Sequence, residues 1–373
     1  MKKTIILCFV FFFLFSFNVS ANSLSTEEFI KNQAEIAGAD KLNDALPESG
    51  KNYFDKNGIT AGESEWIKNI SLSQAIKELW SFIKKKITAP LTTSALIVAV
   101  ILVSGAISLN ESSASSATAL FAVTAVSAAV ITAPILNVIN NAVATMQSAA
   151  VFMTAFVPVF AVVIAVNGQA ATSASMSGLL LGATQIVELI ASHLVVPLMC
   201  GYLSVSVASG VTPLLSKTSF AESLKKLSFW IMSFVTTVFL GVLSIQTAIN
   251  ASADSITMRT AKFVIGSSVP MAGTVLSEAL TTVTASLGML KTSVAIYGVV
   301  ACLVIFLPLL IELLLWRFSF NITALISDVM SSSLTSKLLR SIDAAVSVLI
   351  GIILLSMALF VISLSVVVSV GKV

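Results

Sequence analysis

Long apolar runs are the feature that most restricts how this chain can fold. From residue 90 onward they follow one another with few charges between them, at Pro90–Leu109, Ala117–Asn137, Ser148–Val166, Ser177–Val207, Leu227–Ala248, Thr257–Leu280, Ser293–Trp316 and Ala344–Val368. Most of these runs are long enough to cross a hydrocarbon core of about 30 Å as a helix. Only 10% of the residues are charged, whereas soluble domains carry about 25%. The pattern predicts an all-α polytopic membrane protein.

The first 21 residues have the layout of a secretory signal peptide. Lys2 and Lys3 form a basic start, an apolar stretch continues to Phe17, and small residues precede a cleavage site after Ala21. An uncleaved first span is the alternative interpretation. Cleavage would place the mature N-terminus outside the cytoplasm.

Residues 22–88 are much more polar, with nine lysines and ten acidic residues. The stretch STEEFIKNQAEIAGA opens on Ser25-x-x-Glu28, a capping-box pattern that predicts a helix. SLSQAIKELWSFIKKKI has apolar residues at helical spacing beside lysines, which is typical of an amphipathic helix at a membrane surface. PESGKNYFDKNG between them is rich in turn formers. We predict a small helical extracytoplasmic domain for docking a partner, or alternatively a soluble leader to the membrane domain, residues 89–373.

Two segments of the membrane domain share a pattern at an offset of 112 residues. TMQSAAVFMTAFVP (Thr145–Pro158) and TMRTAKFVIGSSVP (Thr257–Pro270) align without a gap at Thr-Met, Ala and Val-Pro. Apolar runs flank both segments at nearly the same offset, which predicts an internal duplication over approximately residues 117–209 and 229–321. Pro-interrupted segments at matching positions of two halves are typical of transporter-like folds.

The two Val-Pro segments could cross the membrane or enter and leave on one side. With the N-terminus outside and both segments re-entrant, six of the Lys and Arg residues of the membrane domain fall inside and four outside; with two full crossings the division is five and five. The positive-inside rule therefore favours about six spans plus two Pro-broken re-entrant segments, with eight spans as the alternative. A re-entrant second segment would let Glu278 pair with Arg259 or Lys262.

Two ionisable residues lie inside the run Ser177–Val207. Glu188 and His193 are candidates for a proton relay, because ionisable groups in a membrane are costly and often functional. Five positions separate them by about 140° on a straight helix, so interhelical hydrogen bonding is the favoured interpretation. Enzyme motifs are absent, and a single histidine cannot form a His-rich metal site. We expect no catalytic residues, no metal, no cofactor and no nucleic-acid partner.

The stretch MRTAKFVIGSSVPMAGTVLSEALTTVTASLGMLKTSVAIYGVV, within Thr257–Val300, resembles the stage III sporulation protein AE family. The resemblance implies a multi-pass subunit of a secretion-like channel complex in endospore-forming bacteria. It would lie in the mother-cell membrane around the forespore, in contact with other membrane subunits of the same operon. A forespore-side partner would act across the intermembrane space, indirectly, and the complex would support forespore development after engulfment.

The resemblance supplies no established catalytic residues. Its motif positions are therefore candidate functional residues only, together with the first Val-Pro proline and the polar pair of the long run: Arg259, Lys262, Pro270, Gly273, Glu278, Lys291, Pro158, Glu188 and His193. A stand-alone secondary transporter of a small solute is the alternative function, and a structural scaffold without a pore is a third.

Overall fold

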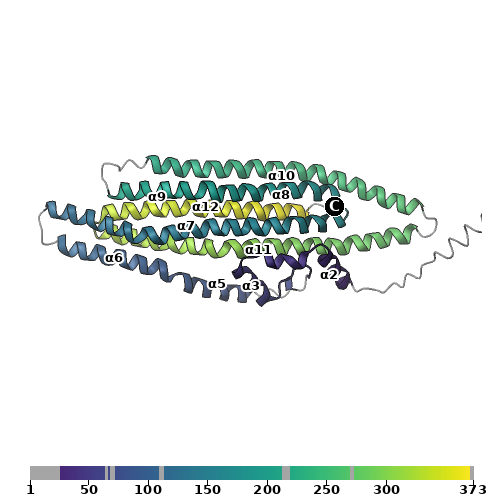
Figure 1. Ribbon diagram of the computed structural model, residues 1–373, viewed down its shortest axis with the longest axis horizontal. Coiled ribbons are helices and arrows are strands. Elements are labelled where there is room, and N and C mark those ends of the chain that lie inside the picture. The colour runs from purple at the N-terminus through teal and green to yellow at the C-terminus, as the bar shows by residue number, and fades with distance from the viewer. Residues whose placement is uncertain are drawn as a thin grey trace, which may run out of the picture.

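The computed structural model describes residues 26–63, 66–67, 72–108, 113–211, 219–268 and 273–369, and every regular element within them is helical. Short helices come first: α2 (Thr26–Ile36), η1 (Ala39–Ala45), α3 (Glu48–Asn57), α5 (Leu72–Lys86) and α6 (Thr88–Ser108). The remainder are α7 (Ser113–Val166), α8 (Ala170–Leu189), η2 (Ile190–Val195), α9 (Val196–Val211), α10 (Ser219–Ser268), α11 (Gly273–Val329) and α12 (Ser333–Ser369). Figure 1 shows an elongated bundle in which the long helices run along one axis.

The N-terminal region is helical, as the sequence predicts, but its described residues also form η1 and α3 between the two predicted helices. α2 and α5 confirm the helices predicted from STEEFIKNQAEIAGA and SLSQAIKELWSFIKKKI. The stretch between them, interpreted from its composition as turns, instead forms α3. Its turn formers mark the boundaries of the helix: Pro47 occupies the N-cap, and Gly58 ends the helix at φ +61°, a conformation that suits glycine.

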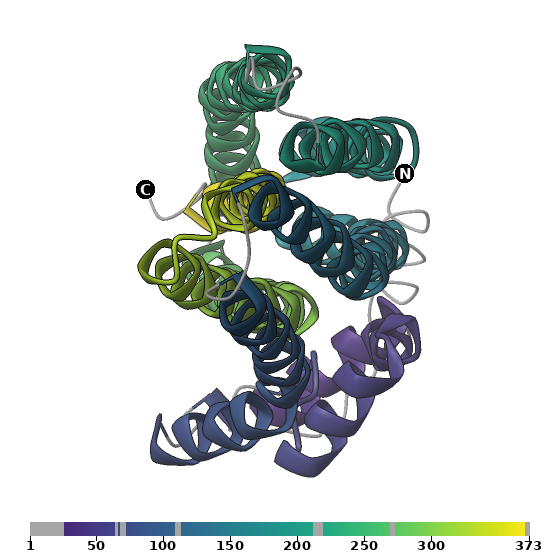
Figure 2. The ribbon, with the colours of Figure 1, turned by 90° about the vertical axis from the view of Figure 1, so that its left-hand side faces the viewer.

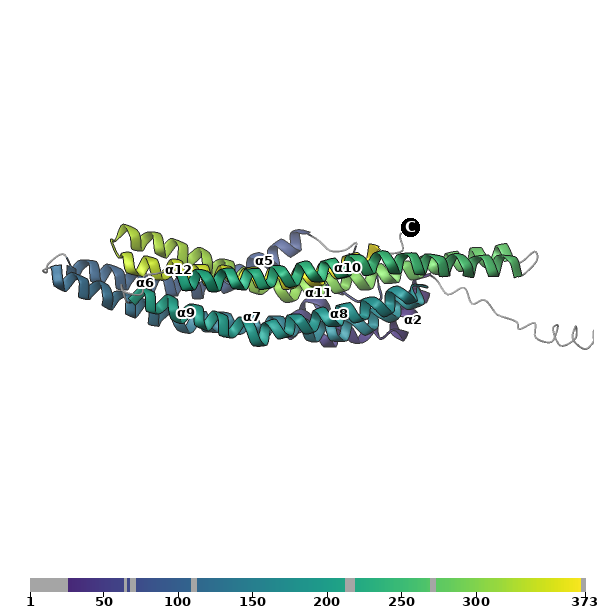
Figure 3. The same ribbon diagram turned by 90° about the horizontal axis from the view of Figure 1, so that it is seen from above.

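The first Val-Pro segment is an uninterrupted part of α7. This helix of 54 residues passes through both Pro134 and Pro158, so the predicted re-entrant hairpin at Thr145–Pro158 is wrong. The runs Ala117–Asn137 and Ser148–Val166, expected as a span and a separate re-entrant segment, form one helix. A proline inside a helix costs about 3 kcal/mol. Three fully buried rings on one face of α7, those of Phe152, Phe156 and Phe160, offset this cost, because each buried phenylalanine is worth about 3–5 kcal/mol. Figure 3 accordingly shows α7 gently bowed rather than broken.

The second Val-Pro pair, Val269-Pro270, lies in the sequence between α10 and α11. α10 ends at Ser268 and α11 begins at Gly273, while Pro270 lies outside the described residues. The offset of 112 would match the α7–α8 connection, residues 167–169, with residues 279–281, which are inside α11. The connection that follows the first segment therefore has no counterpart at the same offset in the second half, and the internal duplication stays a prediction.

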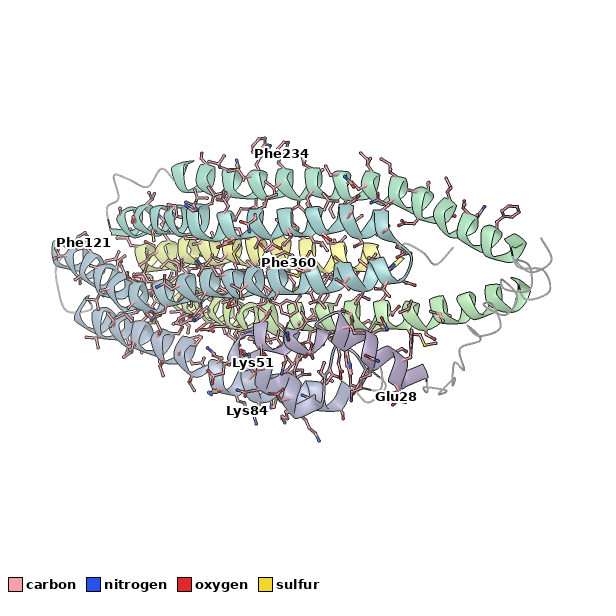
Figure 4. All side chains as sticks on the ribbon, turned by 45° about the vertical axis from the view of Figure 1, so that its right-hand side comes forward. Glu28, Lys51, Lys84, Phe121, Phe234 and Phe360 are labelled. Atoms are coloured by element: carbon pink, nitrogen blue, oxygen red, sulfur yellow. The ribbon has the colours of Figure 1, made fainter. Side chains whose placement is uncertain are left out.

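Helix α12 lies at the centre of the bundle. It contacts α7, α8, α9, α10 and α11, and the end-on view in Figure 2 shows it surrounded by them. Fully buried aromatic residues fill the interior, among them Phe306 and Phe360, whose ring centroids are 6.4 Å apart. Phe360 lies inside the bundle in Figure 4, whereas Phe234 on α10 points away from it.

Two glycines allow neighbouring helices to approach closely. A Cβ atom on Gly298 of α11 would lie 2.6 Å from the Cζ atom of Phe156, and one on Gly351 of α12 would lie 2.5 Å from the Cε1 atom of Phe229. Such distances are shorter than any ordinary carbon–carbon contact. These positions set the spacing of α11 from α7 and of α12 from α10.

Five helical stretches of the described chain are long and apolar enough to cross a bilayer: Ile76–Val103, Thr118–Val166, Lys226–Ile256, Ala285–Val329 and Ser333–Ser365. The stretch in α11 has 45 residues, about 67 Å of helix against a hydrocarbon core of about 30 Å. The run expected as one long span at Ser177–Val207 is divided among α8, η2 and α9. The bundle is therefore a membrane protein whose apolar helices exceed the thickness of one bilayer.

A half-buried ion pair attaches α5 to the bundle. Nζ of Lys86 lies 2.9 Å from Oε2 of Glu312 in α11, across 226 positions of sequence. The Lys86 side chain is 37% exposed and that of Glu312 is 15% exposed. This contact joins the polar N-terminal region to the middle of the longest helix.

Replacing Glu312 with glutamine is expected to weaken this attachment by about 1–2 kcal/mol, between the values for exposed and buried ion pairs. The measurement is the rate of proteolysis within α5 in the purified, detergent-solubilised protein. Exchanging the charges, with Lys86→Glu and Glu312→Lys together, should restore much of the protection. Equal protease sensitivity in the single and double variants would show that the pair does not hold α5.

Candidate functional site

The short connection between α7 and α8 is the point where buried polar residues of three segments meet. It consists of Asn167, Gly168 and Gln169, and Gly168 adopts φ +77°, which a residue with a side chain adopts only with strain. The backbone N–H of Gly168 donates to the carbonyl of Ala165, and that of Gln169 donates to the carbonyl of Ile164. These bonds satisfy the last carbonyls of α7 and reverse the chain into α8.

Asp254 of α10 caps the N-terminus of α8. One carboxylate oxygen accepts from the backbone N–H of Ala171 at 3.0 Å, and the other accepts from the backbone N–H of Thr172 at 3.1 Å and from its hydroxyl at 2.5 Å. The first N–H groups of a helix have no partner within it, and the helix dipole favours a negative charge there. Asp254 is only 7% exposed. The cap therefore lies inside the bundle and comes from a helix that is distant in sequence.

Lys291 of α11 approaches the same connection. Its Nζ donates to the side-chain carbonyl of Gln169 at 2.8 Å, and Lys291 is 3% exposed. A buried ammonium group is costly unless polar groups and opposite charge surround it. The connection thus holds a cation from α11 and an anion from α10.

Asn250 extends the polar cluster by one turn of α10. Its Oδ1 accepts from the hydroxyl of Ser175 in α8 at 3.2 Å. Its amide nitrogen is buried and has no hydrogen-bond partner in the described part of the structure. Asp254, Lys291, Gln169 and Asn250, here called the turn cluster, join α10 and α11 to the α7–α8 connection.

The turn cluster binds helices of distant sequence together. The Lys291 ammonium group donates a hydrogen bond to Gln169, and the Asp254 carboxylate accepts hydrogen bonds from the N-terminus of α8. Within the described residues, no three His, Cys, Asp or Glu side chains are placed to hold a metal ion. Ionisable residues within apolar helices are costly, so Asp254 and Lys291 are candidate functional residues.

Of the residues predicted from the family resemblance, the structure places Lys291 in the turn cluster. Arg259 is exposed on α10, five residues beyond Asp254. The end of α10 and the start of α11 extend past the other helices in Figure 1. Lys262, Gly273 and Glu278 belong to α10 or α11, but their side chains and Pro270 lie outside the described residues. The predicted pairing of Glu278 with Arg259 or Lys262 falls there too.

The remaining candidates are distant from this cluster. Pro158 is exposed on α7, and Glu188 is exposed near the end of α8. His193 lies in η2, a π-helical segment. A π turn forms hydrogen bonds between residues five apart and often occurs at functional sites. It therefore brings Glu188 and His193 closer to a common face than the straight helix assumed from the sequence.

Sequence reasoning missed Asp254, Gln169 and Asn250. Asp254 was the detectable one, since it is an acidic residue near the end of the apolar stretch Lys226–Ile256. Gln169 follows Asn167-Gly168, a dipeptide typical of turns, so its position in a connection was readable as well. The sequence could not show that these residues meet in space, because this depends on how α10 and α11 pack around α8.

Comparison with known proteins places the chain in a family. The family model described as stage III sporulation protein AE matches residues 54–371. The stage III sporulation protein AE of Bacillus subtilis (strain 168) is 28% identical over 234 residues, which cover 63% of this chain and 59% of that relative. No solved structure matches the chain. The chain belongs to the stage III sporulation protein AE family.

Proposed function

We propose that this protein is a membrane subunit of a sporulation channel, a secretion-like complex that links the mother cell to the forespore and is needed for forespore development after engulfment. It would lie in the mother-cell membrane, with its N-terminal helices in the intermembrane space. Other membrane subunits would be its direct partners, and a forespore-side protein an indirect one. Membership of the sporulation family is the observation that carries this proposal.

The dimensions of the bundle support a role beyond simple membrane anchoring. The apolar part of α11 is about twice as long as a hydrocarbon core is thick. α2, α3 and α5 all pack against α11, so the polar N-terminal region is held rigidly against the longest helix. Such a bundle would present a fixed surface for other subunits of a channel base.

α5 would anchor this region at the membrane surface. Its exposed side chains include Ile76 and Trp80, and Lys84 lies 5.8 Å from the centroid of the Trp80 ring. Figure 4 shows Lys84 pointing outward from the lower side of the bundle. Exposed apolar residues next to lysines favour binding at the interface of an anionic membrane.

A stand-alone secondary transporter is the second candidate function. The π-helical segment η2 beside Glu188 and His193 favours it, since such segments are common at functional sites. A transporter would depend on Glu188 as a proton carrier and would work without sporulation partners.

Deletion of the gene in a sporulating host is expected to leave vegetative growth normal and to arrest development after engulfment, as seen by fluorescence microscopy. Glu188→Gln should restore sporulation, whereas Lys291→Met should not, because only Lys291 belongs to the turn cluster. Immunoblotting confirms that each variant accumulates, and Lys291→Arg tests whether the charge suffices. Impaired growth with normal spores, or loss of function with Glu188→Gln alone, would favour the transporter.

A further inference from the structure

A cavity of about 470 Å³ lies between the N-terminal helices and α11. α2, η1, α3 and the segment that follows α3 form its walls, and Tyr297 of α11 contributes from the bundle side. Binding sites for small organic ligands have volumes of about 300–1,000 Å³. The cavity is therefore large enough for a small organic molecule.

Acidic side chains dominate the polar lining of the cavity. Glu35, Asp40, Asp55 and Glu63 contribute carboxylates, and all four residues are exposed. Lys31 also lines the cavity, and its Nζ lies 3.5 Å from Oε1 of Glu63. Four acidic residues and one lysine give the lining a formal charge of −3. Its electrostatic field attracts cations and repels anions.

Two buried polar atoms on this lining have no hydrogen-bond partner among the described residues. They are the hydroxyl oxygen of Tyr297, a residue 1% exposed, and Oδ1 of Asn43. The amide nitrogen of Asn43 donates to Oδ1 of Asp55 at 2.7 Å, which leaves the Asn43 oxygen as an acceptor. An unsatisfied buried polar group costs about 1–3 kcal/mol. A ligand that donates hydrogen bonds would remove this cost at both atoms.

The inner wall of the cavity is aromatic and rigid. Phe54 is fully buried, and its ring meets that of Tyr297 edge to face, with centroids 5.0 Å apart. Phe152 of α7 packs on the other side of Tyr297 at 6.5 Å. The Tyr297 hydroxyl is thus held in place from two sides.

We propose that this cavity binds a small organic cation carrying a primary ammonium group. An ammonium group offers three donors and no acceptor, which fits the carboxylates of Glu35 and Asp40 and the two unsatisfied oxygens. A bare metal ion fits less well, because the described residues contain no group of three or more carboxylate, thiol or imidazole ligands placed for one. The inference goes beyond the proposed function, since it rests on this cavity alone.

The test is isothermal titration calorimetry of the purified full chain in detergent micelles with 1,4-diaminobutane. Binding should weaken about tenfold or more when Glu35→Gln and Asp40→Asn are combined, since two charge contacts are lost. Tyr297→Phe keeps the ring and removes the hydroxyl, so binding should weaken several-fold. Glu48→Gln is the matched control: it removes one exposed carboxylate of the same region that does not line the cavity.

Succinate, an anion of similar length, should not bind. Absence of heat with millimolar diaminobutane would overturn the proposal. So would equal weakening by Glu48→Gln and by the cavity variants, because that would indicate general charge attraction. Calcium binding that depends on Glu35 and Asp40, without diamine binding, would also overturn it and assign the cavity to a metal ion. Unchanged binding in Tyr297→Phe would overturn it as well, because the unsatisfied hydroxyl would then not take part in binding.

Discussion

Asp254→Ala is expected to lower the free energy of unfolding by about 2–4 kcal/mol, because a charged, buried helix cap is lost. The substitution leaves two backbone N–H groups of α8 and the Thr172 hydroxyl without their acceptor. Water cannot replace it, since Asp254 is 7% exposed. The loss should appear as a lower apparent Tm of the detergent-solubilised protein.

Asp254→Asn should fall between the wild type and the alanine variant, because an amide retains one acceptor oxygen. Asp328→Ala is the matched control. Asp328 is paired with Arg340 on the surface, where solvent screens the contact, and its removal should change the Tm little. If the two alanine variants melted at the same temperature, the cap would contribute nothing beyond an ordinary surface carboxylate.

Gly298→Ala is expected to destabilise the bundle by about 1–3 kcal/mol, the usual cost of overpacking a core. The new methyl group would lie 2.6 and 2.8 Å from two atoms of the Phe156 ring and 3.1 Å from a methyl of Leu364. Phe156 is fully buried and cannot swing into solvent. α11 must therefore move away from α7 and α12.

Gly288→Ala in the same helix is the control with the opposite expected sign. Nothing lies within 4 Å of a Cβ at this position, and alanine favours a helix over glycine by about 1 kcal/mol. Thermal unfolding followed by size-exclusion chromatography measures both variants side by side. A Tm raised by both substitutions would show that the α7–α11 spacing can relax, and a Tm lowered by both would show that α11 tolerates no added methyl group.

Long apolar runs predicted the fold class, and a capping box and helical spacing predicted α2 and α5, because these features depend on local sequence. Prediction from local sequence failed where tertiary packing outweighs local preference. Pro158 favours a break, yet the rings of Phe152, Phe156 and Phe160 hold α7 together across it. α3 was missed because residues typical of turns were interpreted as a turn and not as helix ends. Pro47 and Gly58 indicated a turn, although they cap the two ends of a helix.

The candidate site was predictable only in part. Lys291 was predicted as a candidate through its motif, and the structure places it buried in the turn cluster. Its partner Gln169 is 122 positions away, and Asp254 is 83 positions from the backbone it caps. No local pattern encodes such contacts, because they arise only when three helices pack together.

The cap of α8 has a consequence for biosynthesis. Asp254 leaves the ribosome 83 residues after Ala171, roughly 4–17 s later at about 5–20 residues per second. During that delay the N–H groups at the start of α8 lack the acceptor that Asp254 supplies. The α7–α8 connection also lacks its hydrogen bond from Lys291. Until α10 and α11 are made, α7 and α8 lack these stabilising contacts. We expect the insertion machinery or a chaperone to protect them from proteolysis during that time. A stop codon after residue 250 should therefore yield a fragment that membrane proteases remove rapidly.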